Sequence, residues 1–141
     1  MPGSFCAFVL RAFLVATFVG AATAPAVNAA DALIGPDAWR EMTTGKTLHY
    51  YRDGELYGRE YYYPDGEKVE FCSADGFHAV GRWAFKDDTY CFAYFGDLHC
   101  FRHLLRDGDI FVVDVNDAED EQKVDHISDG GPLPCTEGSK V

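Results

Sequence analysis

Turn signals recur along most of this chain and limit how long any element between them can be. Asp-Gly pairs stand at Asp53-Gly54, Asp65-Gly66, Asp75-Gly76 and Asp107-Gly108, and further turn residues lie near positions 87, 96 and 117. Turns at intervals of roughly 8 to 12 residues are typical of antiparallel strands that follow one another along the chain. The sequence therefore predicts a β meander from Thr47 onward.

Eight β-prone segments lie between these turns. They are residues 47–52, 56–63, 67–72, 77–86, 89–95, 98–105, 109–115 and 122–127. A short helix is predicted ahead of them, from Pro36 to Met42, because proline suits the first helical position, Asp37 adds an acid to the first turn and Gly45 can end the helix. An open sheet with so many exposed aromatic residues would aggregate. We therefore predict an all-β fold, an antiparallel meander that closes into a small barrel or half-barrel of lipocalin-like shape.

Alternate positions of the central segments place large side chains on one face of the predicted sheet. They are Trp83, Phe85, Tyr90, Phe92, Tyr94, Phe101 and Phe111. We also predict a three-residue turn at residues 106–108, which places Phe111, Val113 and Val115 on this face. In an eight-stranded barrel such bulk is enough to fill the interior, so we expect a packed lumen that holds no ligand.

Residues 1–30 have the layout of a cleaved secretory signal peptide. Arg11 is its one charge, an apolar stretch follows at residues 12–22, and the small residues Val27 and Ala29 suit signal peptidase. The apolar stretch is shorter than the roughly 20 residues that a membrane-spanning helix needs. We expect a mature domain of residues 31–141 with a loose tail from about residue 130, no membrane span after cleavage, and a periplasmic or secreted location.

Four cysteines follow the leader, at positions 72, 91, 100 and 135. In an oxidising compartment an even number of cysteines predicts disulfides. If the chain forms a hairpin at Phe95-Gly96, Cys91 lies opposite Cys100 at a non-hydrogen-bonded position, where a disulfide can close. Cys72 and Cys135 then pair by exclusion. A zinc site is disfavoured, since none of these cysteines have the Cys-x2-Cys spacing.

The chain is strongly acidic. It has 23 Asp and Glu residues against 12 Lys and Arg, a formal charge of −11, which becomes −12 when Arg11 leaves with the leader. Nucleic acid and anionic lipid surfaces would repel such a chain, so we expect no nucleic-acid partner.

Tyrosine and arginine gather between residues 50 and 63. The candidate binding residues in this segment are Tyr57, Arg59, Tyr61 and Tyr63. Aromatic rings with a polar tip are enriched at binding surfaces, and arginine stacks on such rings. In the alternative interpretation half of the tyrosines point inward and fill the barrel.

Other chemically active residues do not form a catalytic or metal-binding pattern. His99 and His103 are four residues apart, and on a strand this spacing separates them by about 13 Å, too far to share one ion. The acidic run at residues 114–120 lacks the glycine that a calcium loop needs at its sixth position. One alternative remains: a pair of catalytic carboxylates, as in glycosidases, formed by two of Glu55, Glu60, Glu67 and Glu70. We expect a protein that is not an enzyme and that uses no cofactor or metal.

Six short motifs follow one another along the chain from the end of the predicted helix onward. They are Gly45-Lys46-Thr47, Tyr63-Pro64-Asp65-Gly66, Gly81-Arg82-Trp83, Thr89-Tyr90-Cys91, His99-Cys100-Phe101 and Arg106-Asp107-Gly108-Asp109. Over about residues 36 to 127 the chain resembles a group of small secreted proteobacterial proteins known as a domain of unknown function. The resemblance implies a signal peptide, a β meander and a hairpin cysteine pair, and it implies no activity or site.

The motif Gly81-Arg82-Trp83 also resembles the Gly-x-Trp motif of lipocalins. Lipocalins carry this motif on their first strand, whereas three predicted strands precede it here. The chain is also short for a barrel that holds a ligand.

Three functions are consistent with these features. The leading prediction is a non-enzymatic envelope or secreted protein that binds an extracellular protein or a glycan through the Tyr/Arg surface, in an oligomeric state that the sequence does not specify. The first alternative is a carrier of a small apolar ligand that uses the barrel mouth. The second is a hydrolase or a hydrolase inhibitor, which a carboxylate with a perturbed pKa in a cleft would favour.

Overall fold

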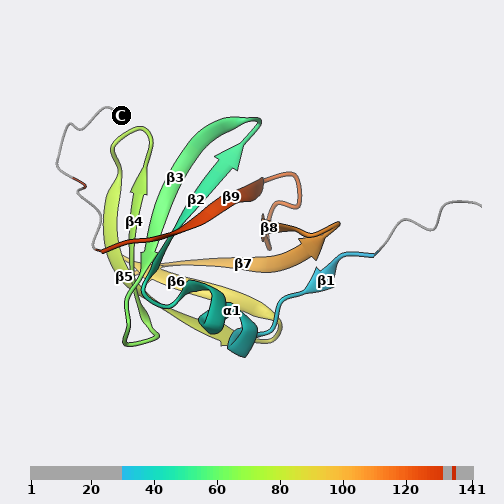
Figure 1. Ribbon diagram of the computed structural model, residues 1–141, viewed down its shortest axis with the longest axis horizontal. Helices are drawn as coiled ribbons and strands as arrows, with labels where there is room; N and C mark the ends of the chain where they lie inside the picture. The colour runs from blue at the N-terminus through green and yellow to red at the C-terminus, as the bar shows by residue number, and fades with distance from the viewer. Residues whose placement is uncertain (1–29, 132–134, 136–141) are drawn as a thin grey trace, which may run out of the picture.

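The computed structural model describes residues 30–131 and Cys135. Nearly all of the predicted signal peptide and most of the predicted tail lie outside the described residues. The elements within residues 30–131 (Figure 1) are β1 Ala32–Leu33, α1 Pro36–Thr43, β2 Lys46–Arg52, β3 Glu55–Tyr62, β4 Lys68–Ser73, β5 His78–Lys86, β6 Thr89–Tyr94, β7 Asp97–Arg106, β8 Asp109–Asp114 and β9 Glu121–Asp129.

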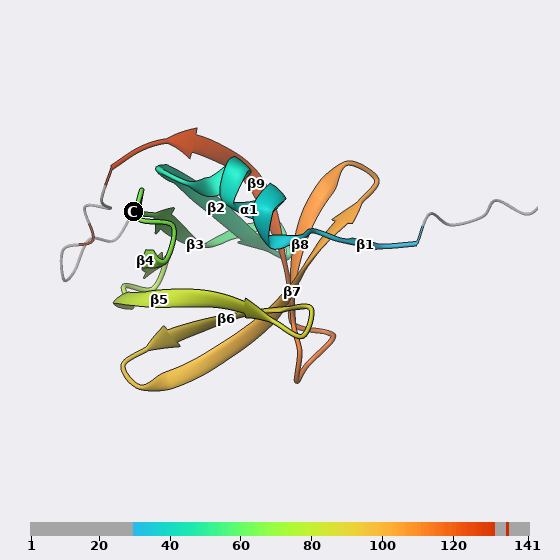
Figure 2. The same ribbon diagram turned by 90° about the horizontal axis from the view of Figure 1, so that it is seen from below.

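Strands β2 to β9 form a closed antiparallel barrel. Their order is β7-β6-β5-β4-β3-β2-β9-β8, and a further pairing of β7 with β8 closes the ring. Figure 2 shows β2, β3 and β9 on one side of the barrel and β5, β6 and β7 on the other. The predicted meander of eight strands after one short helix is thus confirmed, and closure removes the exposed edges of an open sheet.

Strand β1 is an addition that the sequence pattern does not predict. Its two residues pair with β7. The amide of Ile34 then donates to the carbonyl oxygen of His103 at 2.9 Å, and the Tyr90 hydroxyl donates to the carbonyl oxygen of Ile34 at 2.6 Å. These bonds attach the segment before α1 to the barrel wall.

Helix α1 seals one end of the barrel with Trp39, whose side chain is fully buried. The centroid of the Trp39 ring lies 4.0 Å from that of His103, 5.7 Å from that of Tyr90 and 5.9 Å from that of Tyr62. The helix ends at Thr43, and Gly45, with φ of 73°, lets the chain turn directly into β2. A single short helix therefore closes the barrel by inserting one large ring.

The register of β8 differs from the predicted one. Arg106 pairs with Asp109, so the turn has two residues, and both Asp107 and Gly108 have positive φ, as in a type I′ hairpin. Because side chains alternate along a strand, a turn that is one residue shorter exchanges the two faces of β8.

The exchange moves the predicted core residues of β8 out of the interior. Val112 is buried opposite His103, whereas Phe111 lies on the outer surface under the Arg106 guanidinium, 4.3 Å from its ring centroid. Val113 pairs with Glu121 of β9 on the same outer side, and Val115 is exposed. The expectation that Phe111, Val113 and Val115 share the core face is wrong.

The predicted disulfide between Cys91 and Cys100 is confirmed. The two residues are directly paired across β6 and β7, with Cα atoms 4.1 Å apart. The hairpin turns at Phe95 and Gly96, which both have positive φ. Cys72 of β4 is bonded to Cys135, with Cα atoms 6.1 Å apart, and this bond ties the chain beyond β9 to the barrel.

Removal of each disulfide should destabilise the protein according to the loop that it closes. The Cys91→Ala/Cys100→Ala variant removes a cross-link between cysteines that are 9 residues apart. It should lose about 2 to 3 kcal/mol of unfolding free energy in the chain-entropy model. The Cys72→Ala/Cys135→Ala variant opens a separation of 63 residues and should lose about 4 kcal/mol. Urea unfolding of both variants and the oxidised wild type measures the difference, and the reverse order of losses would contradict the prediction.

Candidate functional site

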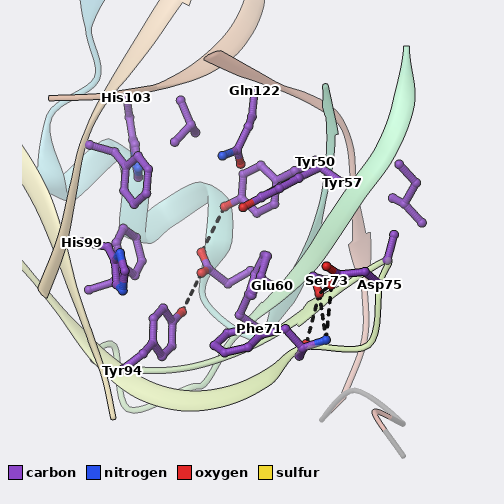
Figure 3. A pocket seen from close by; sticks show the side chains of 16 residues that line it. Tyr50, Tyr57, Glu60, Phe71, Ser73, Asp75, Tyr94, His99, His103 and Gln122 are labelled. Atoms are coloured by element: carbon purple, nitrogen blue, oxygen red, sulfur yellow. Dashed lines mark hydrogen bonds between the residues drawn. The ribbon is translucent and has the colours of Figure 1, made fainter. Parts of the chain in front are cut away.

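A cavity of about 510 Å³ lies inside the barrel (Figure 3). Its inner part is lined by buried side chains, namely those of Tyr50, Glu60, Phe92, Tyr94, His103, Val112 and Gln122. Exposed residues complete the lining, among them Asp75 and Phe77 of the β4–β5 connection and His99 of β7. The cavity therefore extends from the middle of the barrel to a mouth beside the β4–β5 connection.

Large side chains fill the half of the barrel next to α1. Trp83 and Tyr90 are buried there with ring centroids 5.6 Å apart, and Tyr62 lies 6.1 Å from Trp83. Phe85 packs against Tyr90 with a centroid distance of 4.9 Å. In this half the predicted packing of aromatic residues is correct.

The prediction of a filled lumen is wrong for the other half. Phe92, Tyr94 and Phe101 line the cavity and leave its centre empty of side chains. The two-residue turn at β8 supplies the physical reason, because it turns Phe111 outward and places the smaller Val112 on the inner face. A chain of this length therefore encloses a ligand-sized space despite its many aromatic residues.

Glu60 is the acidic group at the centre of the cavity lining. It lies on β3, and its side chain is only 5% exposed. The Tyr50 hydroxyl donates to its Oε1 at 3.0 Å, and the Tyr94 hydroxyl donates to its Oε2 at 2.8 Å (Figure 3). The two tyrosines come from β2 and β6, so the carboxyl group is held from two sides of the barrel.

Burial disfavours the ionised form of the Glu60 carboxyl group. Desolvation raises the pKa of Glu60, and hydrogen bonds from the neighbouring tyrosine hydroxyls offset part of that rise. Desolvation also raises the pKa of Tyr50 and of Tyr94 well above the ordinary value, so both stay protonated donors at neutral pH. The arrangement fixes the orientation of the carboxyl group.

His103 lies at the boundary between the filled half and the cavity. It is completely buried and stacks on Tyr90 with ring centroids 3.9 Å apart and an interplanar angle of 5°. Neither ring nitrogen has a hydrogen-bond partner among the described residues. Desolvation lowers the pKa of His103 to about 3, so the ring is neutral at physiological pH. The structure therefore has a buried histidine without a hydrogen-bond partner among the described residues.

The four predicted binding residues do not lie together. Tyr57 falls at a β-bulge between β2 and β3, where it lines the cavity and has the Arg52 guanidinium 4.1 Å from its ring centroid. Arg59, Tyr61 and Tyr63 alternate with Glu60 and so lie on the outer side of the barrel. Tyr61 is only 5% exposed and packs edge-on against Tyr63, at a centroid distance of 4.7 Å.

The four glutamates considered above for a glycosidase-type carboxylate pair do not lie together either. Glu60 pairs with Phe71 across β3 and β4, whereas Glu70 pairs with Tyr61, so these two buried glutamates face opposite sides of the barrel wall. Glu55 and Glu67 are exposed. The sequence analysis named Glu60 but did not distinguish it from the other three glutamates. The sequence feature that could have done so is its alternation with Gly58 and Tyr62, which puts this acidic residue on the inward face of the strand.

A second group of polar residues lies on the outer face. Glu70, His78 and Cys135 offer ligand atoms within 4.8 Å of one another. Glu70 and His78 are joined through Oε1 and Nε2 at 2.9 Å, and the sulfur of Cys135 is bonded to Cys72. Because a cysteine ligates metal as a thiolate, the disulfide removes it from the ligand set.

Comparison with protein-family models, with curated proteins and with solved structures gives no significant match. The resemblance to a domain of unknown function therefore stays a prediction. Among the described residues no helix is long and apolar enough to cross a membrane.

Substitution of Trp83 should lower the stability of the protein without changing binding in the cavity. Trp83→Ala removes a packed aromatic ring from the filled half and should cost about 3 to 5 kcal/mol of unfolding free energy. Because Trp83 does not line the cavity, the folded variant should bind a cavity probe as the wild type does. Urea unfolding and probe titration on the same preparation test both parts, and a loss below roughly 1 kcal/mol together with abolished binding would contradict the assignment.

His103 should make the protein less stable in mild acid. Its pKa is about 3 in the folded state, so only the unfolded state takes up a proton as the pH falls below about 6.5. Between pH 7 and pH 5 this difference should cost the wild type about 2 kcal/mol relative to His103→Phe, which keeps the stacked ring and removes the titrating group. Urea unfolding at both pH values gives this difference.

His99→Phe is the matched control for that experiment, because it removes an exposed histidine from the same strand. The assignment to His103 is contradicted if the two variants have the same pH dependence of stability.

Proposed function

We propose that this protein binds a small organic ligand inside its barrel. The observation that carries the proposal is the cavity of about 510 Å³ enclosed by the closed sheet. Sites for small molecules have volumes of roughly 300 to 1,000 Å³ and combine an apolar lining with a few placed polar groups. Here the aromatic lining supplies the apolar surface, while Glu60 and Gln122 supply polar groups.

The polar groups support binding because their positions are fixed in advance. Tyr50 and Tyr94 hold the Glu60 carboxyl group, and stacking on Tyr90 holds the His103 ring. A site that is already ordered loses less conformational entropy when a ligand binds.

The proposed compartment is the periplasm or the external medium. The disulfide between Cys91 and Cys100 is consistent with an oxidising, extracytoplasmic location. The predicted signal peptide adds the route of export to this proposal.

Binding of a protein or glycan through the Tyr/Arg surface stays an untested prediction. Tyr57 lines the cavity and Tyr61 is buried, so Arg59 and Tyr63 carry most of the accessible part of that surface. We rank the cavity first because it is a concave space of ligand size with an aromatic lining.

A hydrolase is the second candidate, because a buried carboxyl group with a raised pKa is the kind of group that general acids use. Glycosidases need a second carboxyl group across the scissile bond. The other carboxylate of the cavity lining is Asp75, which accepts hydrogen bonds from Ser73 and the Phe77 amide within its own turn. Loss of chromogenic glycoside hydrolysis in Glu60→Gln would support this candidate.

A neutral fluorescent probe tests the cavity directly. N-phenyl-1-naphthylamine should bind the wild type saturably with one site. Val112→Phe should weaken this binding about tenfold or more, equivalent to ~1.4 kcal/mol, because Val112 lines the cavity and the larger ring occupies its space. Fluorescence titration gives the dissociation constants.

Val80→Phe is the matched control, since Val80 is 45% exposed and absent from the cavity lining. This variant should bind the probe like the wild type. The proposed function is wrong if the wild type shows no saturable binding, or if both variants bind as the wild type does.

A further inference from the structure

We infer that the ligand of this cavity is a small organic cation, an amine attached to an aromatic or apolar body. The inference rests on the proposed function and specifies the chemistry of the same site. Its basis is the placement of one oriented carboxyl group among aromatic rings.

Charge selects a cation over an anion. Among the 16 residues that line the cavity in the described part of the chain, none is Lys or Arg, whereas two, Glu60 and Asp75, are acidic. The Arg52 guanidinium lies over the ring of Tyr57, which lines the cavity, and it pairs with the Asp120 carboxylate. The formal charge of the whole chain, −11, acts in the same direction by attracting cations to the mouth.

Glu60 still has room for a ligand. Each carboxylate oxygen can accept two hydrogen bonds. Tyr50 donates to one oxygen of Glu60 and Tyr94 to the other, and the neighbouring Tyr62 hydroxyl also lowers the pKa of Glu60, so the tyrosines take at most three of the four acceptor positions. An ammonium group can therefore donate to the same oxygens without displacing either tyrosine. The bond would join opposite charges in a site shielded from water, where such an interaction is strong.

Aromatic faces surround this carboxyl group. The centroid of Phe71 lies 6.0 Å from that of Tyr57 and 6.5 Å from that of Tyr94, and Phe92 stacks near Tyr94 at 6.3 Å. Figure 3 shows Tyr50, Phe71 and Tyr94 around Glu60. Such faces attract cations through their quadrupoles and also accept the apolar body of the ligand.

Three indoles of nearly equal size separate charge from shape. Tryptamine carries an ammonium group, tryptophol is its neutral alcohol, and indole-3-propionate carries a carboxylate. Isothermal titration calorimetry with wild-type protein should give the tightest binding for tryptamine, about tenfold or more tighter than tryptophol, a difference of ~1.4 kcal/mol. Indole-3-propionate should bind most weakly.

The Glu60→Gln variant tests whether the preference for the cation comes from the charge of Glu60. The amide keeps the shape of the side chain and removes its charge, so tryptamine should bind about tenfold or more weakly, while tryptophol stays within about twofold of its wild-type affinity. Glu70→Gln is the matched control, because Glu70 is also buried but lies on the outer side of the barrel wall. It should leave the affinity for all three indoles unchanged.

The wild-type ranking decides the inference even if Glu60→Gln does not fold. Equal affinities of tryptamine and tryptophol, or tightest binding of indole-3-propionate, overturn the inference and leave the proposed function standing. The same holds if no indole binds while N-phenyl-1-naphthylamine does. If the naphthylamine probe does not bind either, the proposed function itself is wrong. Equal loss of tryptamine and tryptophol binding in Glu60→Gln also overturns the role of its charge.

Discussion

The insertion of Trp39 into the end of the barrel is the contact on which the rest of the structure depends. Its ring lies against His103, Tyr90 and Tyr62, which come from three different strands. This contact closes one end of a sheet that is otherwise an open tube. The cavity begins beyond this end, and its inner wall is ordered by the same aromatic stack that stabilises the fold.

Burying Glu60 opposes folding, since desolvation disfavours the carboxylate form. Two tyrosine hydroxyls compensate part of this cost, and they come from strands on different sides of the barrel. His103, whose ring nitrogens have no hydrogen-bond partner among the described residues, adds to this cost in the same interior. A small domain with two disulfides can carry such groups because the cross-links restrict its unfolded state. Polar groups kept in a core at this cost are typical of binding sites.

The strands and the disulfide between Cys91 and Cys100 were predictable from the sequence, because Asp-Gly turns and strict alternation are local signals. The face of β8 was not, since it depends on whether one turn has two or three residues, and a change of one residue reverses every side chain of the strand. Glu60 was only one of four candidate glutamates in the sequence, because its contacts with Tyr50 and Tyr94 arise only when the sheet closes. The cavity likewise follows from closure and not from any local motif.

The division of the barrel into a packed half and a hollow half separates two properties that most small domains combine. Trp39, Trp83 and Tyr90 hold the fold together at one end, while the residues around Glu60 line the cavity at the other. Substitutions at the hollow end change the shape and charge of the cavity with little loss of packed surface. Under the proposed function, mutations at the cavity end would exchange one ligand for another, while selection for foldability would act mainly on the opposite end.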